Sequence, residues 1–188
     1  ALDLHDRKCD QNLARLHKAG ISGVRTVSGD ACELNEVLTS FDAMLGEPAL
    51  FDTVFIDAPC SGTGTMRRHP EIPWRLTEND VTTELPRLQL TMLKEAAARV
   101  AAGGELIYAT CSVFDEENTQ VVDAFLASPE GEGFTVAPLS EAQILQLPEY
   151  DHAKSLVTLR QNDRGLFQSV PVNADSYDGH FCARLVRN

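Results

Sequence analysis

The sequence lacks the features that mark a membrane protein, a disulfide scaffold or a zinc domain. Its apolar runs are far shorter than the roughly 18 residues that a membrane span needs. Its first residues, ALDLHDRKCD, have no charged head followed by an apolar stretch, as a signal peptide would. The five cysteines are an odd number, and no two form the C-x2-C pair typical of zinc sites. We therefore expect a cytoplasmic protein with neither membrane partner nor metal.

Positive charge is also scarce. Sixteen lysines and arginines stand against 28 acidic residues, a net charge of -12, which argues against a chain that binds nucleic acid over its whole surface. The exception is the stretch Cys60–Leu76, where Arg67, Arg68 and Arg75 face a single acid, Glu71. A site for a polyanion is expected in this stretch.

What the chain has is the length of one domain, residues 1–188, and a regular alternation of strand and helix signals. Strands are predicted over Leu2–Leu4, Val24–Val27, Asp52–Ile56, Glu105–Ala109, Phe134–Ala137, Leu166–Val172 and His180–Val186. Helices are predicted over Asp6–Ala19, Leu34–Leu45, Thr77–Ala102 (with Pro86 splitting it or opening its longer part) and Asp115–Leu126. The stretch Ser140–Gly165 is polar and irregular. This order indicates an α/β fold with a mostly parallel sheet and an antiparallel C-terminal hairpin.

Several chemically active residues follow the predicted strands. In open α/β sheets, ligands bind beyond the carboxyl ends of the strands, and Asp3, Asp30, Asp57 and Cys111 stand at or just past such ends. Aspartates there suit a nucleoside cofactor, because a carboxylate accepts hydrogen bonds from ribose hydroxyls or an adenine amino group. They suit helix capping equally well.

Two cysteines end neighbouring predicted strands, Cys60 in the stretch DAPCSGTG and Cys111 after ELIYAT. Parallel strands lie about 4.8 Å apart, so two such thiols can face one reacting atom. A deprotonated thiol adds to electron-poor carbon, which suggests one nucleophile and one proton acceptor. The alternative is that both are small buried apolar residues.

The residues after Cys60 suggest contact with a ligand. The segment Ser61–Gly64 lacks the lysine of a phosphate-binding loop, and its glycines are predicted to let the backbone approach a flat ligand. Arg67 and Arg68 could hold a phosphodiester backbone while Trp74 stacks on a base, or they could belong to an ordinary solvated loop.

The motifs DAPCSGTG, RRHPEI (residues 67–72) and YATCSVFDEEN (residues 108–118) together resemble the RNA 5-methylcytosine methyltransferases of the Sun/Fmu and nucleolar-protein (Nop/NSun) group. The resemblance covers nearly the whole chain. Relatives that methylate amino groups carry an Asn/Asp-Pro-Pro-aromatic loop instead. DNA cytosine methyltransferases share Pro59-Cys60 but lack the Thr-Cys-Ser of this chain. Having both cysteines therefore points to RNA.

The resemblance implies a Rossmann-like sheet that binds S-adenosylmethionine and methylates carbon-5 of cytosine. It makes Cys111 the nucleophile that adds to carbon-6 of the base. Cys60 would assist loss of the carbon-5 proton and release of the adduct. Asp57 and Pro59 would lie against the target base, with Asp57 also near the methyl donor.

The resemblance also assigns the outer contacts of the site. Asp3 matches the acid that binds the ribose of the cofactor, and Asp30 the acid on its adenine side. Arg67 and Arg68 would contact the RNA. Ribosomal RNA, specifically 16S rRNA, is the favoured substrate. Transfer RNA is the first alternative, and a non-catalytic RNA-binding or assembly module is another, although the presence of both thiols argues against it.

Two departures from the family pattern set further expectations. The chain begins downstream of the family's glycine-rich cofactor loop, so we expect a carboxyl-terminal part of the catalytic domain that lacks the first strand. By itself this part is expected to bind S-adenosylmethionine weakly or not at all and to be inactive. Its Leu2 strand would then pair with the Val54 strand, or a neighbour would supply a strand. Gly179-His180-Phe181 replaces the usual Gly-Phe-Phe, a change expected to affect packing only.

Overall fold

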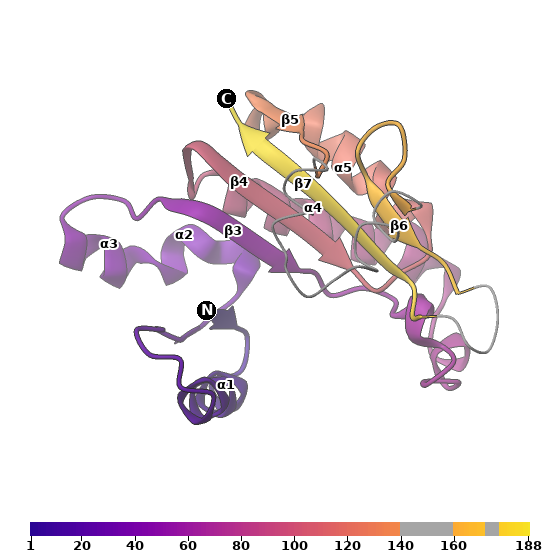
Figure 1. The fold of residues 1–188 in the computed structure, drawn as a ribbon, viewed down its shortest axis with the longest axis horizontal. Helices are drawn as coiled ribbons and strands as arrows, with labels where there is room; N and C mark the ends of the chain where they lie inside the picture. The colour runs from indigo at the N-terminus through magenta and orange to yellow at the C-terminus, as the bar shows by residue number, and fades with distance from the viewer. Residues whose placement is uncertain (140–159, 172–176) are drawn as a thin grey trace. The chain divides into compact units, whose positions relative to one another are not determined.

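The computed structural model describes residues 1–139, 160–171 and 177–188 (Figure 1). Most of the polar stretch Ser140–Gly165, and Val172 at the end of a predicted strand, lie outside these residues. The chain divides into two compact units, Ala1–Leu50 and Phe51–Asn188. Each unit is described by itself.

The first unit is a strand-helix-strand motif followed by short helices. It contains β1 (Leu2–Asp3), α1 (Asp6–Lys18), β2 (Val27–Ser28), a 3-10 turn (Ala31–Glu33), α2 (Leu34–Val37) and α3 (Thr39–Leu45). The strands β1 and β2 pair in parallel, Leu2 opposite Val27. Cys9 of α1 is buried, and its thiol lies 3.3 Å from the carbonyl oxygen of Val27. Helix α1 and strand β1 match the prediction, whereas β2 begins at the last residue of the predicted strand Val24–Val27, and the predicted helix Leu34–Leu45 is two short helices.

The pairing of β1 differs from one expectation. Its hydrogen-bonded neighbour is β2, and β3 belongs to a different sheet, so the Leu2 strand does not pair with the Val54 strand. β1 is two residues long, and both of its residues are in register with β2.

The second unit contains a five-stranded mixed sheet and two longer helices. Its main elements are β3 (Phe51–Asp57), α4 (Leu85–Ala97), β4 (Val100–Thr110), α5 (Thr119–Leu126), β5 (Phe134–Val136), β6 (Phe167–Ser169) and β7 (His180–Arg187). Its short helical segments are Thr63–Thr65, Ile72–Trp74, Asp80–Glu84, Asp115–Glu117 and Pro129–Gly131. The strand order is β3-β4-β7-β5, and β6 also pairs with β7.

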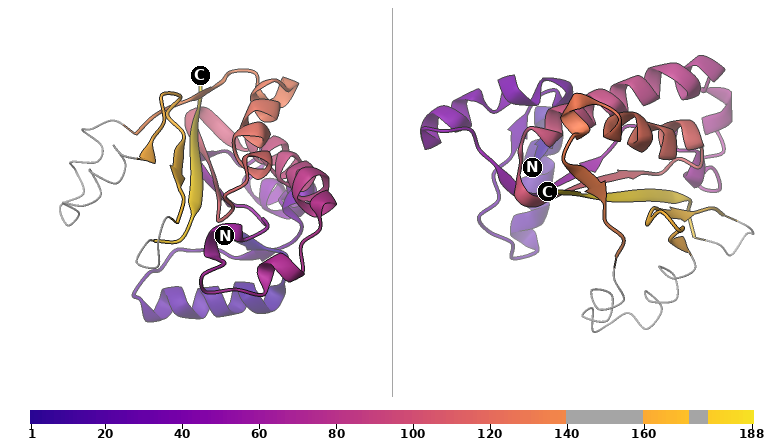
Figure 2. Two further views of the ribbon diagram at one scale, coloured as in Figure 1. Left: turned by 90° about the vertical axis from the view of Figure 1, so that its right-hand side faces the viewer. Right: turned by 90° about the horizontal axis from the view of Figure 1, so that it is seen from above.

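Strand directions confirm an α/β arrangement with antiparallel late strands, but the sheet of this unit is mixed rather than mostly parallel, because β7 pairs antiparallel with each of its neighbours. β3 and β4 run parallel, with Asp57 opposite Ala109. β7 runs antiparallel to β4, and its other edge pairs with β5 near one end and with β6 near the other. Helices α4 and α5 lie on one face of this sheet (Figure 2).

The core of this unit lies between the sheet and the two helices. Alternate residues of β4 and β7 are buried, as period-2 strands with one covered face require. Tyr108 and Phe181 meet edge to face, with ring centroids 6.2 Å apart, and Phe125 meets Phe134 in the same way at 5.5 Å. The opposite face carries the odd-numbered residues of β4, including Ala109, and Cys111 follows Ala109 two residues later.

The predicted helix Thr77–Ala102 needs a correction at its end. Thr77 and Asp80 do form the reciprocal cap that the sequence indicates, and Pro86 does lie in the first turn of α4. However, α4 ends at Ala97, and β4 begins at Val100, which is fully buried and pairs with Phe51. The helix propensity of alanine suggested a longer helix, and tertiary pairing overrides it.

Candidate active site

Two loops bring Cys60 and Cys111 together at the carboxyl ends of β3 and β4. Their Sγ atoms lie 3.3 Å apart. The parallel ladder continues through the N–H of Ala58, which donates to the carbonyl of Ala109 at 2.9 Å. The N–H of Gly64 then donates to the carbonyl of Cys111 at 2.8 Å. The close approach expected from the two strand ends is therefore confirmed.

The two thiols differ in their acid strength. The hydrogen bond from Cys60 lowers the pKa of Cys111 to about 6, against burial and the charge of Asp57, which raise it. The pKa of Cys60 is raised by its hydrogen bond to Cys111, by burial and by the negative charge on Cys111. Cys60 is thus the thiol donor, and Cys111 is the thiolate acceptor at neutral pH.

A buried carboxylate ties the two cysteine loops together. Glu117 is fully buried, and its Oε1 accepts from the N–H of Ser61 at 2.8 Å and from Nε2 of Gln89 at 3.1 Å. Its Oε2 accepts from the hydroxyl of Ser112 at 2.5 Å, and its carbonyl accepts from the hydroxyl of Tyr108 at 2.6 Å. One side chain therefore fixes Ser61, next to Cys60, and Ser112, next to Cys111.

Smaller polar groups complete this network. The hydroxyls of Ser61, Thr63 and Ser112 lie 3.1 to 3.3 Å from one another. Asn118 accepts from Thr110 at 2.6 Å and donates to the carbonyl of Ser112 at 3.0 Å. The sequence motif DEEN contains Glu117 but did not predict a role for this residue. The signal present in the sequence is an acid and an amide, Glu117 and Asn118, a few residues after a buried strand and Cys111.

Gly64 has a different role from the one expected. A Cβ at Gly64 would lie 2.2 Å from the carbonyl oxygen of Gly179, and the N–H of Gly179 donates to the carbonyl of Gly64 at 2.8 Å. The glycine therefore permits close backbone packing against the residue before β7, rather than the approach of a flat ligand. Gly62 serves a turn, with a left-handed φ of 71°.

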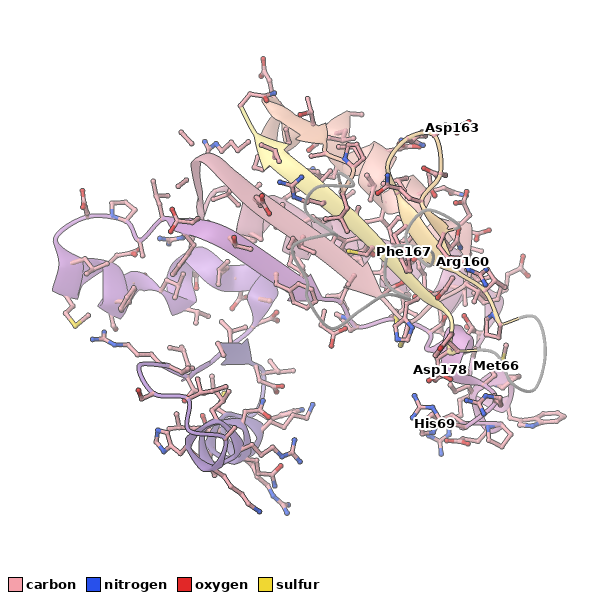
Figure 3. All side chains as sticks on the ribbon, viewed as in Figure 1. Met66, His69, Arg160, Asp163, Phe167 and Asp178 are labelled. Atoms are coloured by element: carbon pink, nitrogen blue, oxygen red, sulfur yellow. The ribbon has the colours of Figure 1, made fainter. Side chains whose placement is uncertain are left out.

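Arg67 and Arg68 are half-exposed and share one carboxylate. Nε of Arg68 donates to Oδ2 of Asp178 at 2.8 Å, and Nη2 of Arg67 lies 3.7 Å from Oδ1. Figure 3 shows Asp178 beside the segment that carries Met66 and His69. The hydrogen bond from Arg68 and the charges of both arginines hold the pKa of Asp178 below its usual range. Trp74, further along, is 89% exposed.

Asp57 and Pro59 lie beside the sulfur pair. Asp57 is the exposed last residue of β3, and it is near enough for its charge to raise the pKa of Cys111. Pro59 is exposed, and its carbonyl accepts from Nε2 of Gln89 at 2.9 Å. The structure therefore brings together Cys60, Cys111, Asp57 and Pro59, four of the predicted site residues.

Asp3 and Asp30 lie in the first unit, Asp3 as the last residue of β1 and Asp30 two residues past the end of β2. Oδ1 of Asp3 accepts from the N–H of His5 at 3.0 Å, and Oδ1 of Asp30 accepts from the N–H of Cys32 at 2.8 Å. Both therefore cap local turns through one oxygen. Asp30 is exposed and Asp3 partly so. Acceptor oxygens past adjacent parallel strands fit the hydroxyl and amino donors of a nucleoside.

The described residues contain neither a membrane-spanning helix nor a cluster of metal ligands. No helix within them is long and apolar enough to cross a membrane. Over the same residues, no group of three histidines, cysteines or acids could hold a metal ion.

Comparisons with known proteins agree with one another. A family model described as 16S rRNA methyltransferase RsmB/F matches residues 1–186. "Ribosomal RNA small subunit methyltransferase B" of Salmonella arizonae is 49% identical over 138 residues, 73% of this chain and 26% of that protein. The protein of that name from Pectobacterium atrosepticum is 35% identical over 142 residues, 76% of this chain and 28% of that protein. The chain thus spans about a quarter of the length of these relatives.

Solved structures show the same fold. The crystal structure titled PH0851 has a TM-score of 0.74 and 30% identity, and covers 98% of this chain and 36% of that one. NSun6 from Pyrococcus horikoshii with SFG has a TM-score of 0.70 and 20% identity, and covers all of this chain and 40% of that one. The chain has the Rossmann-like α/β fold of these methyltransferases.

Proposed function

The chain belongs to the RsmB/F family of 16S rRNA methyltransferases, and from that membership we propose that it methylates carbon-5 of a cytosine in 16S rRNA. The observation that carries the proposal is the pair of sulfur atoms 3.3 Å apart with opposite pKa shifts. Cytosine carbon-5 is a weak nucleophile, so a methyl transfer to it needs prior activation by a group that adds to the ring.

Cys111 is the activating nucleophile. Its pKa of about 6 leaves it ionised at neutral pH, and half-exposure leaves its sulfur open to a base. The thiolate forms a bond to carbon-6 of the cytosine, and the electrons of the 5,6 double bond move to carbon-5. S-adenosylmethionine, when bound, supplies the methyl group that this carbon takes.

Cys60 acts after the adduct has formed. Two of the three causes that raise its pKa are the hydrogen bond and the charge of Cys111, and both disappear once the Cys111 sulfur is bonded to carbon. Cys60 can then release its proton to solvent and accept the proton from carbon-5. The double bond re-forms, the bond from carbon-6 to sulfur breaks, and Cys111 leaves as a thiolate.

The remaining site residues bind rather than react. Asp57 can accept a hydrogen bond from the cytosine amino group, and Pro59 offers an apolar edge to the ring. Asp3 and Asp30 would hold the ribose and adenine of S-adenosylmethionine. Arg67 and Arg68 would contact RNA phosphates, a role that does not depend on the base sequence. A ribosomal substrate places the reaction in the cytoplasm.

The proposal is tested with the full-length protein and 16S rRNA containing 5-fluorocytidine. Fluorine at carbon-5 blocks proton loss, so the wild type should form a stable adduct that survives denaturing electrophoresis. Cys111→Ala should form none. Cys60→Ala should form an adduct even with ordinary RNA, because release is slowed. Cys182→Ala, on the neighbouring strand, is the matched control and should behave as the wild type.

Other outcomes would overturn the assignment. Adduct formation by Cys111→Ala would show that another residue, Cys60 being the nearest thiol, is the nucleophile. RNA binding without any adduct or methyl transfer by the wild type would favour a binding module. Faster methylation of transfer RNA than of 16S rRNA would change the substrate and leave the chemistry intact.

A further inference from the structure

His180 lies near Cys111, close enough for its charge to act on the thiol. Antiparallel pairing of β4 with β7 ends with Thr110 opposite Phe181, and Cys111 and His180 are the next residues on the two chains, so the same register directs them toward each other. Directly opposite residues of an antiparallel pair project from the same face, with Cβ atoms about 5 Å apart. Thr110 and Phe181 are both buried, whereas Cys111 and His180 both lie on the more open face.

The backbone around His180 holds its imidazole in one form. Nδ1 lies 3.2 Å from the carbonyl oxygen of Asp178, and a carbonyl can only accept, so Nδ1 carries the hydrogen. Protons are then gained and lost at Nε2. The N–H of His180 donates to the hydroxyl of Ser169 at 2.9 Å, and the tight packing of Gly179 on Gly64 fixes the preceding residue.

The charges around Cys111 come from three parts of the second unit. They are Asp57 at the end of β3, Cys60 and Arg68 from the segment after it, and Asp178 and His180 at the start of β7. Asp57 disfavours a thiolate at Cys111, and the positive charge of Arg68 is largely taken up by its ion pair with Asp178. Beyond the hydrogen bond from Cys60, the positive charges of His180 and Arg68 favour the Cys111 thiolate, and only that of His180 is not engaged in an ion pair with Asp178.

We propose that His180 is a positioning residue whose protonated imidazole stabilises the thiolate of Cys111 across the β4–β7 pair. The proposal rests on the proposed function in one respect, that Cys111 is the nucleophile. It also replaces the expectation that a histidine at this place affects packing only. Histidine is the side chain that changes charge near neutral pH, so this contact makes the reactivity of Cys111 depend on pH through a second group.

The test measures the reactivity of Cys111 in the full-length protein without RNA. The rate of alkylation by iodoacetamide is followed by mass spectrometry of the Cys111 peptide from about pH 5 to 9. His180→Gln should slow alkylation about two- to threefold at pH 6, the size expected for the thiolate fraction when unit charges one strand spacing apart interact in a high dielectric. At pH 9 the rates should coincide, because Cys111 is then fully ionised in both proteins.

Two more variants separate charge from packing. His180→Lys keeps a positive charge and should alkylate at pH 6 at least as fast as the wild type, whereas His180→Phe should follow His180→Gln. His69→Gln is the matched control, because His69 pairs with Glu71 away from the thiols, and it should leave the profile unchanged.

The outcomes are distinguishable from those of the methylation assay. Superimposable profiles for His180→Gln and the wild type, or a loss of rate that is equal at every pH, would overturn this inference while leaving cytosine methylation untouched. A failure of adduct formation with RNA would leave the alkylation result standing, since alkylation needs neither RNA nor methyl donor.

Discussion

Residues 58–65 and 66–75 follow one another along the chain and are held in opposite ways. In the first segment Ser61, Thr63 and Thr65 are buried, and hydrogen bonds join it to α4 and to the loop after β4. In the second segment Trp74 is 89% exposed, and both leading arginines depend on one carboxylate, that of Asp178. A bond-forming thiol needs a fixed position, whereas cations that meet a polyanion can adjust their position on contact.

Removing the centre of the buried network should produce the largest effect. Glu117→Ala leaves the N–H of Ser61, Nε2 of Gln89 and the hydroxyl of Ser112 without their acceptor in a buried site. We expect a loss of about 3 kcal/mol or more in the free energy of unfolding, and loss of the 5-fluorocytidine adduct. Urea denaturation measures the first. Glu116→Ala, one residue earlier and partly exposed, should stay within about 0.5 kcal/mol of the wild type.

Gly64→Ala should lower the free energy of unfolding less than Glu117→Ala. The Cβ added at Gly64 would overlap the carbonyl of Gly179, so β7 must shift, at an expected cost of about 1–3 kcal/mol. Gly103→Ala is the control, because Gly103 has a left-handed φ of 74° but open space around it. That variant should cost about 1–2 kcal/mol through backbone strain and leave adduct formation intact. Equal loss of adduct in both variants would contradict the packing role of Gly64.

Gly64 and Glu117 show which parts of the structure the sequence does not predict. The alternation of apolar runs predicts the helices and strands, and the positions of Cys60 and Cys111 at strand ends predict their meeting, because those signals are local or follow from sheet topology. The contacts of Gly64 with Gly179, and of Glu117 with Ser61 and Gln89, join residues far apart in sequence. No local pattern encodes such pairings.

The exposed segment is tested by removing its charges. Arg67→Ala with Arg68→Ala should weaken RNA binding about tenfold and reduce the slope of log affinity against log salt by about 1 for each arginine. Fluorescence anisotropy at several salt concentrations gives both quantities. Arg87→Ala removes a more exposed arginine, which lies on α4 and pairs with Glu84, and should change neither. The adduct formed at saturating RNA should persist, since the sulfur pair is untouched.

The smallest expected effect is an increase in affinity. Asp178→Asn removes the carboxylate that competes with RNA phosphates for the two arginines, and RNA binding should tighten about threefold. Because the hydrogen bond from Arg68 lowers the pKa of Asp178 in the folded protein, its charge persists at neutral pH, and the competition fades only at a pH below the ordinary range of an aspartate. Weaker binding by Asp178→Asn would show that the carboxylate positions the arginines instead.

The central place of β7 in the sheet has a consequence for folding kinetics. Glu105 pairs with Val186, about eighty residues later, so the pairing that directs His180 toward Cys111 closes a long loop. Long-range strand pairing is slow because loop-closure entropy is lost before any contact forms. The β3–β4 pair and its helices can therefore form first, with the thiol reactivity of Cys111 appearing last. Pulsed alkylation during refolding would reveal this as a delay between the burial of Tyr108 and the appearance of a reactive thiolate.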